Sequence, residues 1–324
     1  MNTANPVDVT KVFCDLDDFN GVFIPAWRQS LLPEEKPQRD REFIMSPAEV
    51  MTILILFHCS GFRNLKNFYI GYVPFVLGRE FPNRVSYNRF VELEQSVLVP
   101  LCAYLNTRRV TSKGIAFIDS TPLRVCHNRR IPRHRTFNGL AARGKTSVDW
   151  YYGFKLHLVI DDQGELVSFL VTPGNIDDRK GLKEMAKFIN GKLFGDKGYI
   201  SKALQESLWE QGIELITKIR KNMKKVFIGD FDKIMLRKRS IIETVNDQLK
   251  NISQLEHTRH RSLANFMVNI VCALIAYSWQ PKKPSLNLRN WKTNSTDLIV
   301  LTCALVRGQA SKNNLLLVQP KNKT

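Results

Sequence analysis

A change in the spacing of the apolar residues, at about Ile115, most constrains the fold of this 324-residue chain. Before this point apolar residues recur at helical spacing, and Ser46 and Ser86 stand where N-caps would begin two of the segments. Ser46 is followed by Pro47 and Glu49, the N1 proline and the glutamate of a capping box. The first third of the chain therefore predicts a compact all-α region.

Beyond Ile115 the apolar runs become short and either continuous or alternating, as strands require. The runs at 151–161 and 165–174 are separated by Asp162-Gln163-Gly164, a turn sequence that predicts a hairpin. Later runs alternate with helical segments, so we expect an α/β fold with a mixed sheet flanked by helices. The expected domains are a helical one at 1–112, a sheet domain at 113–262, and a C-terminal helix with a polar tail at 263–324.

Positive charge is concentrated in two segments. Lys and Arg outnumber Asp and Glu by 48 to 30, a formal net charge of +18. The windows Arg124–Lys145 and Lys218–Arg239 hold seven and nine basic residues, against no acidic residues in the first and two in the second. Solubility is the simplest use of such residues, but two dense clusters favour a nucleic-acid partner, with a membrane surface a distant third.

The cysteines and the hydropathy point to the cytoplasm. Six cysteines without CxxC spacing predict free thiols in a reducing compartment. The first ten residues lack the features of a signal peptide. The most apolar run, Leu263–Trp279, is short for a membrane span and contains Asn265 and Asn269, so it predicts a buried helix and no membrane partner.

Two of the apolar runs, beginning near Ile115 and Lys192, stop at an aspartate, Asp119 or Asp196. In open sheets with helical crossovers ligands gather beyond the strand ends, so these two carboxylates can share a site. An aspartate after a strand is more often a turn former or a helix cap. We assign that ordinary role to Asp161, Asp162, Asp177 and Asp178.

The third candidate carboxylate, Glu243, lies on a helix expected at roughly 233–253. At 100° per residue this helix has two stripes. The apolar stripe is Ile242, Val245, Leu249 and Ile252, and the polar stripe is Arg239, Glu243, Asn246 and Lys250. Taken alone, Glu243 is half of a surface ion pair with Arg239, which contributes only about 0.2–0.5 kcal/mol.

Three carboxylates beside two basic segments suit the cleavage of DNA. In-line attack on a phosphodiester is assisted by two divalent ions, about 3.5–4 Å apart, that stabilise the attacking and the leaving oxygen. Mg²⁺ takes oxygen ligands, so Asp119, Asp196 and Glu243 can form a cage together with phosphate oxygens. We therefore expect their carboxyl groups to converge in the folded chain.

The residues around these carboxylates resemble a known family. Asp119 in AFIDSTPLRV, the strand GFKLHL, Asp196 in FGDKGY and Glu243 in RSIIETVNDQLK resemble the insertion-sequence transposases with an RNase H-like DDE catalytic domain, closest to the insertion sequence 982 group. The Asp-Lys-Gly-Tyr run and the spacing of Arg239, Glu243 and Lys250 resemble the signature of the wider superfamily. The resemblance is strongest between Asp119 and Lys250.

The resemblance extends over residues 8–288 and departs from the signature at one position. Leu236 stands where the signature often has a tyrosine, which leaves a stacking or end-contact role there open. The family implies a transposase that nicks DNA at terminal inverted repeats and joins the freed 3′ ends to target DNA. It also implies a homo-oligomer on DNA, in the bacterial cytoplasm.

The family implies roles for single residues as well. Asp119, Asp196 and Glu243 would be catalytic and hold the metal, two Mg²⁺ or Mn²⁺ ions. Arg239 and Lys250 would hold the phosphate backbone near the scissile bond. Lys197, in the Asp-Lys-Gly-Tyr run, is predicted to contact DNA with them.

Further DNA contacts are predicted outside these motifs. The segment RVCHNRRIPRHR supplies Arg129 and Arg130 as a DNA-binding arm. Lys155 and His157 alternate along GFKLHL and share one side of the strand. Lys155 is predicted to contact DNA, whereas for His157 a structural role is equally expected.

Two alternatives to a transposase stay open at this point. One is a non-catalytic DNA-binding protein, such as a repressor derived from a transposase, and the other is a metal-dependent nuclease without strand transfer. The N-terminal helices are also ambiguous. Arg63 and Lys66 lie at i, i+3 and could belong to a helix that reads DNA, or to a plain packing domain.

Overall fold

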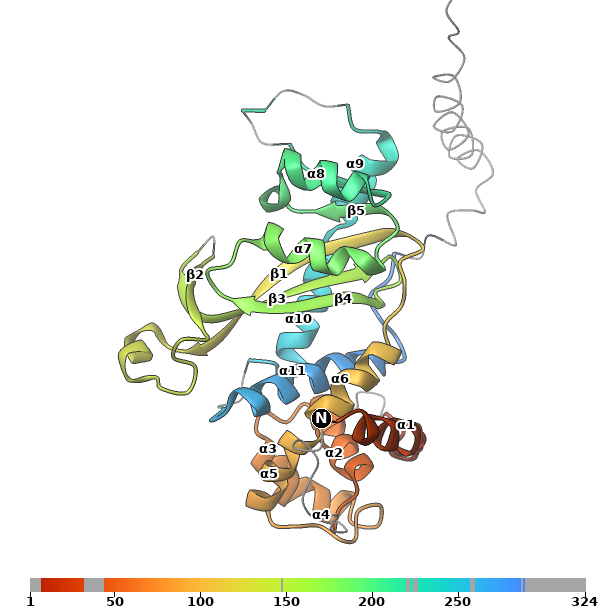
Figure 1. Ribbon diagram of the computed structural model, residues 1–324, viewed down its shortest axis with the longest axis vertical. Helices are drawn as coiled ribbons and strands as arrows, with labels where there is room; N and C mark the ends of the chain where they lie inside the picture. The colour runs from red at the N-terminus through yellow and green to blue at the C-terminus, as the bar shows by residue number, and fades with distance from the viewer. Residues whose placement is uncertain are drawn as a thin grey trace, which may run out of the picture. The chain divides into compact units, whose positions relative to one another are not determined.

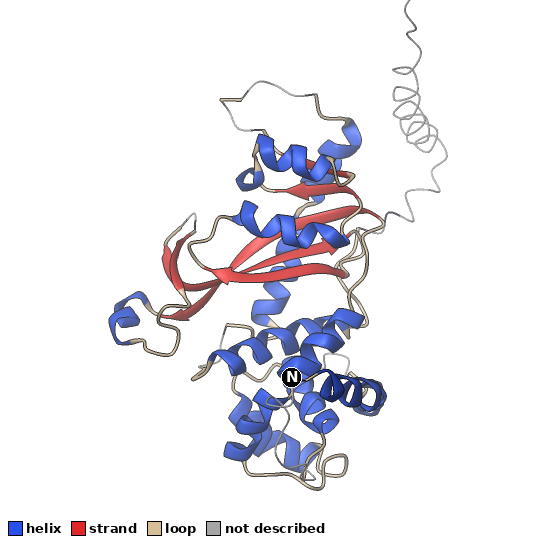
Figure 2. Cartoon of the chain, viewed as in Figure 1, coloured by secondary structure: helices blue, strands red, loops and turns tan. Residues whose placement is uncertain are grey.

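The computed structural model describes residues 7–31, 44–146, 148–219, 222–223, 227–256, 260–286 and 288. The chain divides into two compact units, 1–284 and 285–324, and the architecture below is that of the first. Figure 2 shows its strands gathered in one layer, with a cluster of helices beside that layer. No helix in the described ranges is long and apolar enough to cross a membrane. The polar tail expected after residue 288 lies outside the described residues.

The N-terminal region is helical, as predicted. The capping box is confirmed, since Ser46 Oγ accepts a hydrogen bond from the Glu49 N–H at 3.1 Å and the Glu49 carboxylate accepts one from the Ser46 N–H at 2.7 Å. Ser86 caps a later helix by accepting from the Arg89 N–H. The elements are α1 (Val9–Ser30), α2 (Pro47–Cys59), α3 (Leu65–Asn67), the π-helix η2 (Phe68–Tyr72), α4 (Val73–Val76), α5 (Tyr87–Ser96) and α6 (Leu98–Thr107).

The apolar run near the end of the unit is the buried helix α11 (Leu263–Ser278), as predicted. It packs against α2, α5 and α6, far from it in sequence, and touches α10 (Ser240–Asn251). Figure 1 shows α11 between the sheet and the N-terminal helices. A helix that is apolar on nearly every side requires this enclosure.

Six strands form one mixed sheet. Their order is β2-β3-β1-β5-β6, with β4 paired to β3 on the same edge as β2. β3 is antiparallel to its neighbours, whereas β5 is parallel to both β1 and β6. The predicted fold class, an RNase H-like mixed sheet flanked by helices and preceded by helices, is confirmed in this architecture. The strands are β1 (Gly114–Cys126), β2 (Ala142–Lys145), β3 (Trp150–Asp161), β4 (Leu166–Pro173), β5 (Gly191–Gly195) and β6 (Ile213–Thr217).

The remaining helices lie around the sheet or in its connections. Two of them, α9 and α10, follow one another around a bend at Arg239. They are α7 (Asp178–Met185), α8 (Lys202–Trp209), α9 (Asp230–Lys238) and α10, with the 3-10 turns η3 (Asn128–Arg133), η4 (Ala186–Phe188) and η5 (Lys197–Tyr199).

The two faces of the sheet are covered by different helices, and Figure 1 shows α7 in front of the sheet with α10 behind it. On the α7 side, Ile118 of β1 and Leu193 of β5 belong to a buried apolar cluster with α7 and α8. On the α10 side, Phe117 and Phe194 stack with their ring centroids 5.6 Å apart. Because side chains alternate along a strand, the odd-numbered residues of β1 near Phe117 face α10.

Two helices expected to be continuous are broken. The helix expected after Ser86 is two helices, because Pro100 in the first turn of α6 has no N–H and its ring excludes the carbonyl four residues earlier. The helix expected at about 233–253 is α9 and α10, which meet at Arg239. Ile252, expected in its apolar stripe, lies past the end of α10 and is 47% exposed, so that assignment is wrong.

The first strand is longer than the sequence indicated. β1 does not stop at Asp119 but continues to Cys126, held by pairing to β3 as far as Tyr152. Its pairing to β5 ends at Phe117, so the later part of β1 has no described strand beside it on that edge. Pro122, which has no N–H to donate, is therefore tolerated there. The short strand β2 was not foreseen, because its four residues carry no apolar pattern.

Candidate active site

Asp119 and Asp196 stand at corresponding positions on two neighbouring parallel strands. In the pairing of β1 with β5, Phe117 lies opposite Phe194. Each aspartate follows its phenylalanine by two residues, so side-chain alternation turns both toward the face covered by α10. Asp196 keeps an extended backbone, with φ −75° and ψ 167°, before the turn η5 begins. The shared position therefore lies where β5 ends, midway along β1.

Glu243 reaches the same face on α10. Ile242, Val245 and Leu249 are fully buried, as the predicted apolar stripe requires, and α10 contacts β1. The side chain of Glu243 is 56% exposed. Asn246, one turn further along the polar stripe, is buried and donates a hydrogen bond of 3.2 Å from Nδ2 to Asp119 Oδ2.

Arg239, at the bend between α9 and α10, links two of the three carboxylates. Its Nη2 lies 2.6 Å from Glu243 Oε1, and its Nη1 lies 3.6 Å from Asp119 Oδ1. The guanidinium side chain is only 17% exposed, so the pair with Asp119 is screened less than a surface pair. The expected role of Arg239 as a phosphate contact stays a prediction, because here the guanidinium engages the carboxylates.

The electrostatics of Asp119 reflect this crowding of charge. The pKa of Asp119 is raised to about 6, chiefly by burial and also by the carboxylates of Glu243 and Asp196. The guanidinium of Arg239 and the backbone N–H of Ser120 act in the opposite direction and lower that pKa. Asp119 therefore lies near enough to Glu243 and to Asp196 to be repelled by both, and Arg239 offsets that repulsion.

The donor set of this site suits a divalent ion in its chemistry. Its ligating atoms are carboxylate oxygens, the kind that Mg²⁺ and Mn²⁺ prefer. Beside Asp119, the buried Oδ1 of Asn246 has no hydrogen-bond partner in the described part of the chain, so a further oxygen is available. However, no three His, Cys, Asp or Glu side chains among the described residues are gathered closely enough to hold a metal. The expected convergence of the three carboxyl groups stays a prediction.

Lys250, the other predicted phosphate contact, is used within the chain. Its Nζ donates a hydrogen bond of 2.7 Å to the carbonyl oxygen of Pro122 and lies 3.5 Å from Glu256 Oε1. The same Glu256 oxygen accepts a hydrogen bond from the backbone N–H of Arg124 at 3.0 Å. These contacts tie the end of α10 to the later part of β1.

The structure does not bring Lys155 to the carboxylates. Lys155 pairs with Pro122 and His157 with Ser120, so both lie on the α7 side of the sheet, opposite Asp119. Lys155 Nζ donates hydrogen bonds to the Ile176 carbonyl at 2.8 Å and to Asp178 at 2.9 Å, and its side chain is 16% exposed. These contacts are structural, and the predicted DNA contact of Lys155 has no support from its position.

His157 on the same side is a buried structural residue. Only 1% of it is exposed, and its Nε2 lies 2.8 Å from Thr172 Oγ1. Asp177 and Asp178 open α7, as the ordinary reading of these aspartates predicts, with Asp177 accepting from the Arg179 N–H. Asp161 closes the hairpin by accepting from the backbone N–H groups of Gln163 and Glu165.

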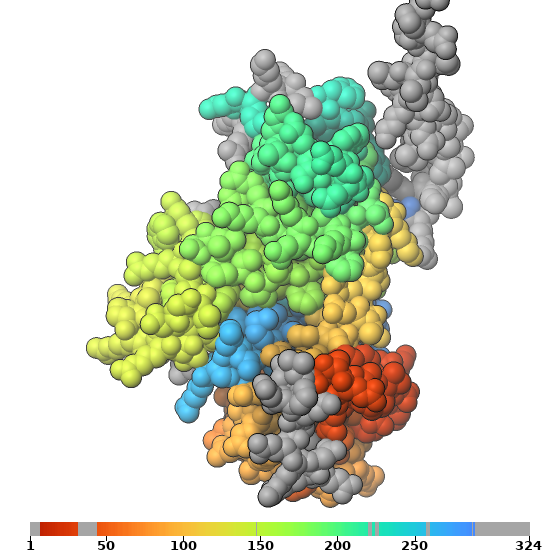
Figure 3. Space-filling model, viewed as in Figure 1, coloured from red at the N-terminus to blue at the C-terminus, as the bar shows by residue number. Residues whose placement is uncertain are grey.

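The other predicted DNA contacts are exposed. Lys197 follows Asp196 directly, in the turn η5. Arg129 and Arg130 are exposed on η3, and Figure 3 shows the yellow-green segment that contains η3 projecting from the side of the sheet. The first basic window therefore lies mostly on the surface, whereas part of the second lies outside the described residues.

Two residues at the site have roles that the sequence did not reveal. Asn246 was placed on the polar stripe, but its hydrogen bond to Asp119 depends on how α10 docks on β1. Glu256 lies beyond the end of α10, and no sequence motif indicates its role. Its partners Lys250 and Arg124 come together only in the folded domain.

Comparison with known proteins matches part of this chain to a transposase domain. Residues 109–263 match the model of a family described as Transposase DDE domain, and the matched segment contains all three candidate carboxylates. No curated protein matches the chain. Among solved structures, the crystal structure of the Mos1 Strand Transfer Complex is similar over 79% of this chain and 82% of that chain, with 11% identity and a TM-score of 0.20.

Proposed function

We propose that this chain, which carries a transposase DDE domain at residues 109–263, is the transposase of a bacterial insertion sequence. It binds the terminal inverted repeats of the element, cleaves phosphodiester bonds there with divalent metal ions, and transfers the 3′ ends into target DNA. The resemblance of its motifs favours the insertion sequence 982 group. The observation that carries the proposal is the register that turns Asp119 and Asp196 to one face of the sheet, beside the helix that bears Glu243.

Each residue of the site has a definite task under this proposal. Asp119, Asp196 and Glu243 hold the metal, Mg²⁺ or Mn²⁺, with two ions expected. A bound ion supplies a Lewis acid that stabilises charge on the attacking and the leaving oxygen. Asn246 orients the carboxylate of Asp119 through its hydrogen bond. Arg239 pairs with Asp119 and Glu243, and it would be available to a phosphate if these carboxylates held a metal.

Attraction of DNA to a site rich in carboxylates requires a compensating positive field. The formal charge of +18, and the exposed Arg129, Arg130 and Lys197, supply part of it. We place the protein in the bacterial cytoplasm, on DNA, as a homo-oligomer that pairs two element ends.

One observation favours a second candidate, a DNA-binding repressor without catalytic activity. The described residues hold no carboxylate group compact enough for a metal, and Arg239 already neutralises two of the three carboxylates. A metal-dependent nuclease without strand transfer shares the proposed site and differs only in its product.

Nicking of terminal-repeat DNA in the presence of Mg²⁺ separates these candidates. We expect nicking by the wild type, loss of nicking with retained DNA binding in Glu243→Gln, and no change in the control Glu206→Gln, an exposed residue of α8. A wild type that never nicks, or a Glu243→Gln variant that nicks as well as the wild type, contradicts the catalytic assignment. Cleavage without a joined product identifies the nuclease.

A further inference from the structure

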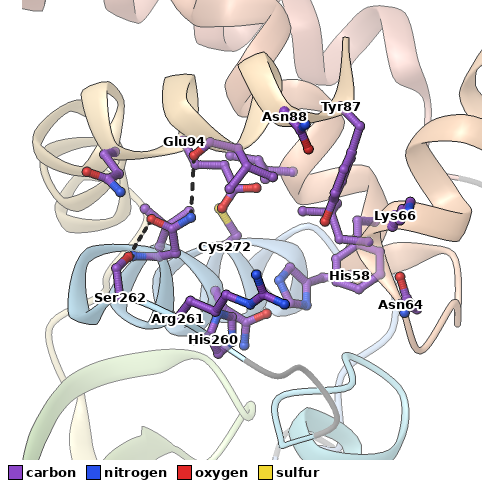
Figure 4. A pocket seen from close by; sticks show the side chains of 18 of the residues that line it. His58, Asn64, Lys66, Tyr87, Asn88, Glu94, His260, Arg261, Ser262 and Cys272 are labelled. Carbon is purple, nitrogen blue, oxygen red and sulfur yellow. Dashed lines mark hydrogen bonds between the residues drawn. The ribbon is translucent and has the colours of Figure 1, made fainter. Parts of the chain in front are cut away.

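A large cavity lies away from the candidate active site, between the N-terminal helices and α11. Its volume is about 830 Å³, within the range of small-molecule sites. Figure 4 shows it lined from one side by α2, α3 and α5 and from the other by α11 and the residues just before it. Its apolar lining includes Leu54, Val91, Val268 and Cys272.

The interior of the cavity holds a buried carboxyl group with unused hydrogen-bonding capacity. Glu94 of α5 is 5% exposed, and its Oε1 has no hydrogen-bond partner in the described part of the chain. Burial raises the pKa of Glu94 to about 8, while a hydrogen bond with Asn265 acts in the opposite direction. At neutral pH the group is therefore mostly an uncharged acid, which offers one O–H donor and one acceptor.

The two histidines of the cavity are also uncharged at neutral pH. Burial lowers the pKa of His58 to about 4, and burial together with His58 lowers that of His260 to about 4. His58 Nδ1 lies 2.5 Å from the carbonyl oxygen of Ser253, so Nδ1 carries the proton and Nε2 is an acceptor. The interior thus presents neutral polar groups, which suit an uncharged, polar ligand rather than an ion.

One wall of the cavity is aromatic. Tyr87, the first residue of α5, lines it and is half-buried. Its ring packs against Tyr69 with centroids 6.1 Å apart, which restrains the ring. Burial raises the pKa of Tyr87, Glu94 raises it as well and Arg261 lowers it, so both side chains lie near this phenol.

The remaining polar lining is cationic and exposed. Arg63 and Lys66, at the start of α3, and Arg261, just before α11, line the cavity, and each is exposed to solvent. None of the three forms an ion pair with another residue in the part of the chain that the structure describes. An anion can therefore bind there without displacing a carboxylate of those residues.

We infer that this cavity binds a single unpaired nucleotide, with the base against Tyr87 and Glu94 and the phosphate at Arg63, Lys66 and Arg261. A planar polar base beside an aromatic ring, joined to a phosphate, is complementary to a neutral interior with a cationic edge. The nucleotide comes either from a DNA strand, where one base has turned out of the stack, or from the free pool. The strand source rests on the proposed function; the nucleotide site itself does not.

Other ligand chemistries fit less well. A metal ion is disfavoured by three cations on the lining and by the neutral Glu94 and His58, and no metal-binding group of side chains occurs among the described residues. A fatty acyl chain is disfavoured by Asn265 and Asn269, whose amides lie inside the cavity.

The test is calorimetric titration of the full-length protein with each of the four deoxynucleoside monophosphates, in EDTA. We expect binding by the wild type and about tenfold weaker binding by Tyr87→Leu, because stacking is lost. The double variant Arg63→Ala/Lys66→Ala changes only exposed residues, so it should fold normally and also bind about tenfold more weakly. The matched controls are Glu92→Gln on the exposed side of α5 and Arg79→Ala, neither of which lines the cavity.

Two results would overturn the inference: no binding of any of the four monophosphates at millimolar concentration, or equal binding by wild type and both cavity variants. A second arm adds a short single-stranded oligodeoxynucleotide as competitor. Competition assigns the site to a base within a strand, and binding without competition assigns it to the free nucleotide. Because nicking is absent in EDTA, and Glu243→Gln should bind monophosphates like the wild type, failure here is distinguishable from failure of the proposed function.

Discussion

Asn246 Nδ2 on α10 lies 3.2 Å from Asp119 Oδ2 on β1, so a neutral amide fixes the carboxylate that a metal would bind. Asn246 is 6% exposed, and its own Oδ1 has no partner among the described residues. A buried amide that leaves half of its hydrogen-bonding capacity unused destabilises the fold unless another group supplies the missing partner. We therefore assign Asn246 a positioning role at the candidate active site.

Truncation of this amide should impair catalysis more than folding. We expect Asn246→Ala to lower metal-dependent nicking about 10–100-fold, because residues that orient a metal ligand have effects of this size. A positioning role also predicts a weaker apparent affinity for the metal, measured as the Mg²⁺ concentration at half-maximal nicking. Asn251→Ala, an exposed asparagine on the same helix, is the control. Equal losses in both variants would contradict the assignment.

Removal of Arg239 should strengthen metal binding while weakening DNA cleavage. Its guanidinium pairs with Asp119 and Glu243 and so competes with a bound cation. Repulsion between the guanidinium and a bound cation amounts to about 1 kcal/mol, so its loss predicts several-fold tighter binding of Mn²⁺ by Arg239→Gln. Titration calorimetry without DNA measures this binding. Arg237→Gln, an exposed neighbour on α9, should bind Mn²⁺ like the wild type. Unchanged or weaker binding in Arg239→Gln would show that the metal does not use these carboxylates.

Lys155 should matter for stability and not for DNA binding. Its ammonium group holds the Ile176 carbonyl and Asp178 on the side of the sheet opposite Asp119. We expect Lys155→Met to lower the free energy of unfolding by about 1–3 kcal/mol. DNA affinity and its dependence on salt should match those of Lys183→Met, an exposed control on α7. A shallower salt dependence for Lys155→Met alone would restore its predicted DNA contact.

Glu94 should make the protein less stable as the pH rises. The pKa of Glu94 is about 8 in the folded chain against about 4.5 as the ordinary value, so between these values the folded state retains a proton that the unfolded state has lost. The contribution of Glu94 to the free energy of unfolding is therefore fully present below about pH 4.5. It is lost as the pH rises through about 8, by an amount on the order of a few kcal/mol. Urea denaturation should show that Glu94→Gln removes this loss.

The pH series needs a comparison between variants, because two histidines act with the opposite sign. The pKa of His58 and of His260 is lowered to about 4 by burial, so their contribution is lost as the pH falls from about 6.5 through about 4. The difference between wild type and Glu94→Gln isolates the carboxyl group, with Glu92→Gln as control. A difference that does not change with pH would mean that Glu94 is ionised in the folded chain.

Local features of the fold could be predicted because their causes are local. The capping box at Ser46 needs only residues within one turn, and the buried side of α10 follows from the spacing of Ile242, Val245 and Leu249. The break between α5 and α6 was also accessible from Pro100, whose effect on the preceding turn outweighed the apolar pattern. No proline or glycine marks the break at Arg239 in the sequence. In the structure the Ile242 N–H donates a hydrogen bond to the Arg239 carbonyl there.

The parts of the site that escaped prediction depend on register and docking. The face on which Lys155 lies is set by its pairing with Pro122 on another strand, and a shift of one residue would reverse it. One partner of Lys250, the carbonyl of Pro122, lies far away in the sequence on β1, and the other, Glu256, lies beyond the end of α10. The sequence alone therefore predicts candidate site residues, but it does not predict the residues that they contact in the folded chain.

The pairing of β1 with β5 also governs when the candidate site can exist during synthesis. Gly114 meets Gly191 only after β2, β3, β4 and α7 have been made, and α10 emerges later still. A chain leaving the ribosome can form the β3–β4 hairpin while its carboxylates remain apart. Asp119, Asp196 and Glu243 can therefore act together only when translation of the domain is nearly complete.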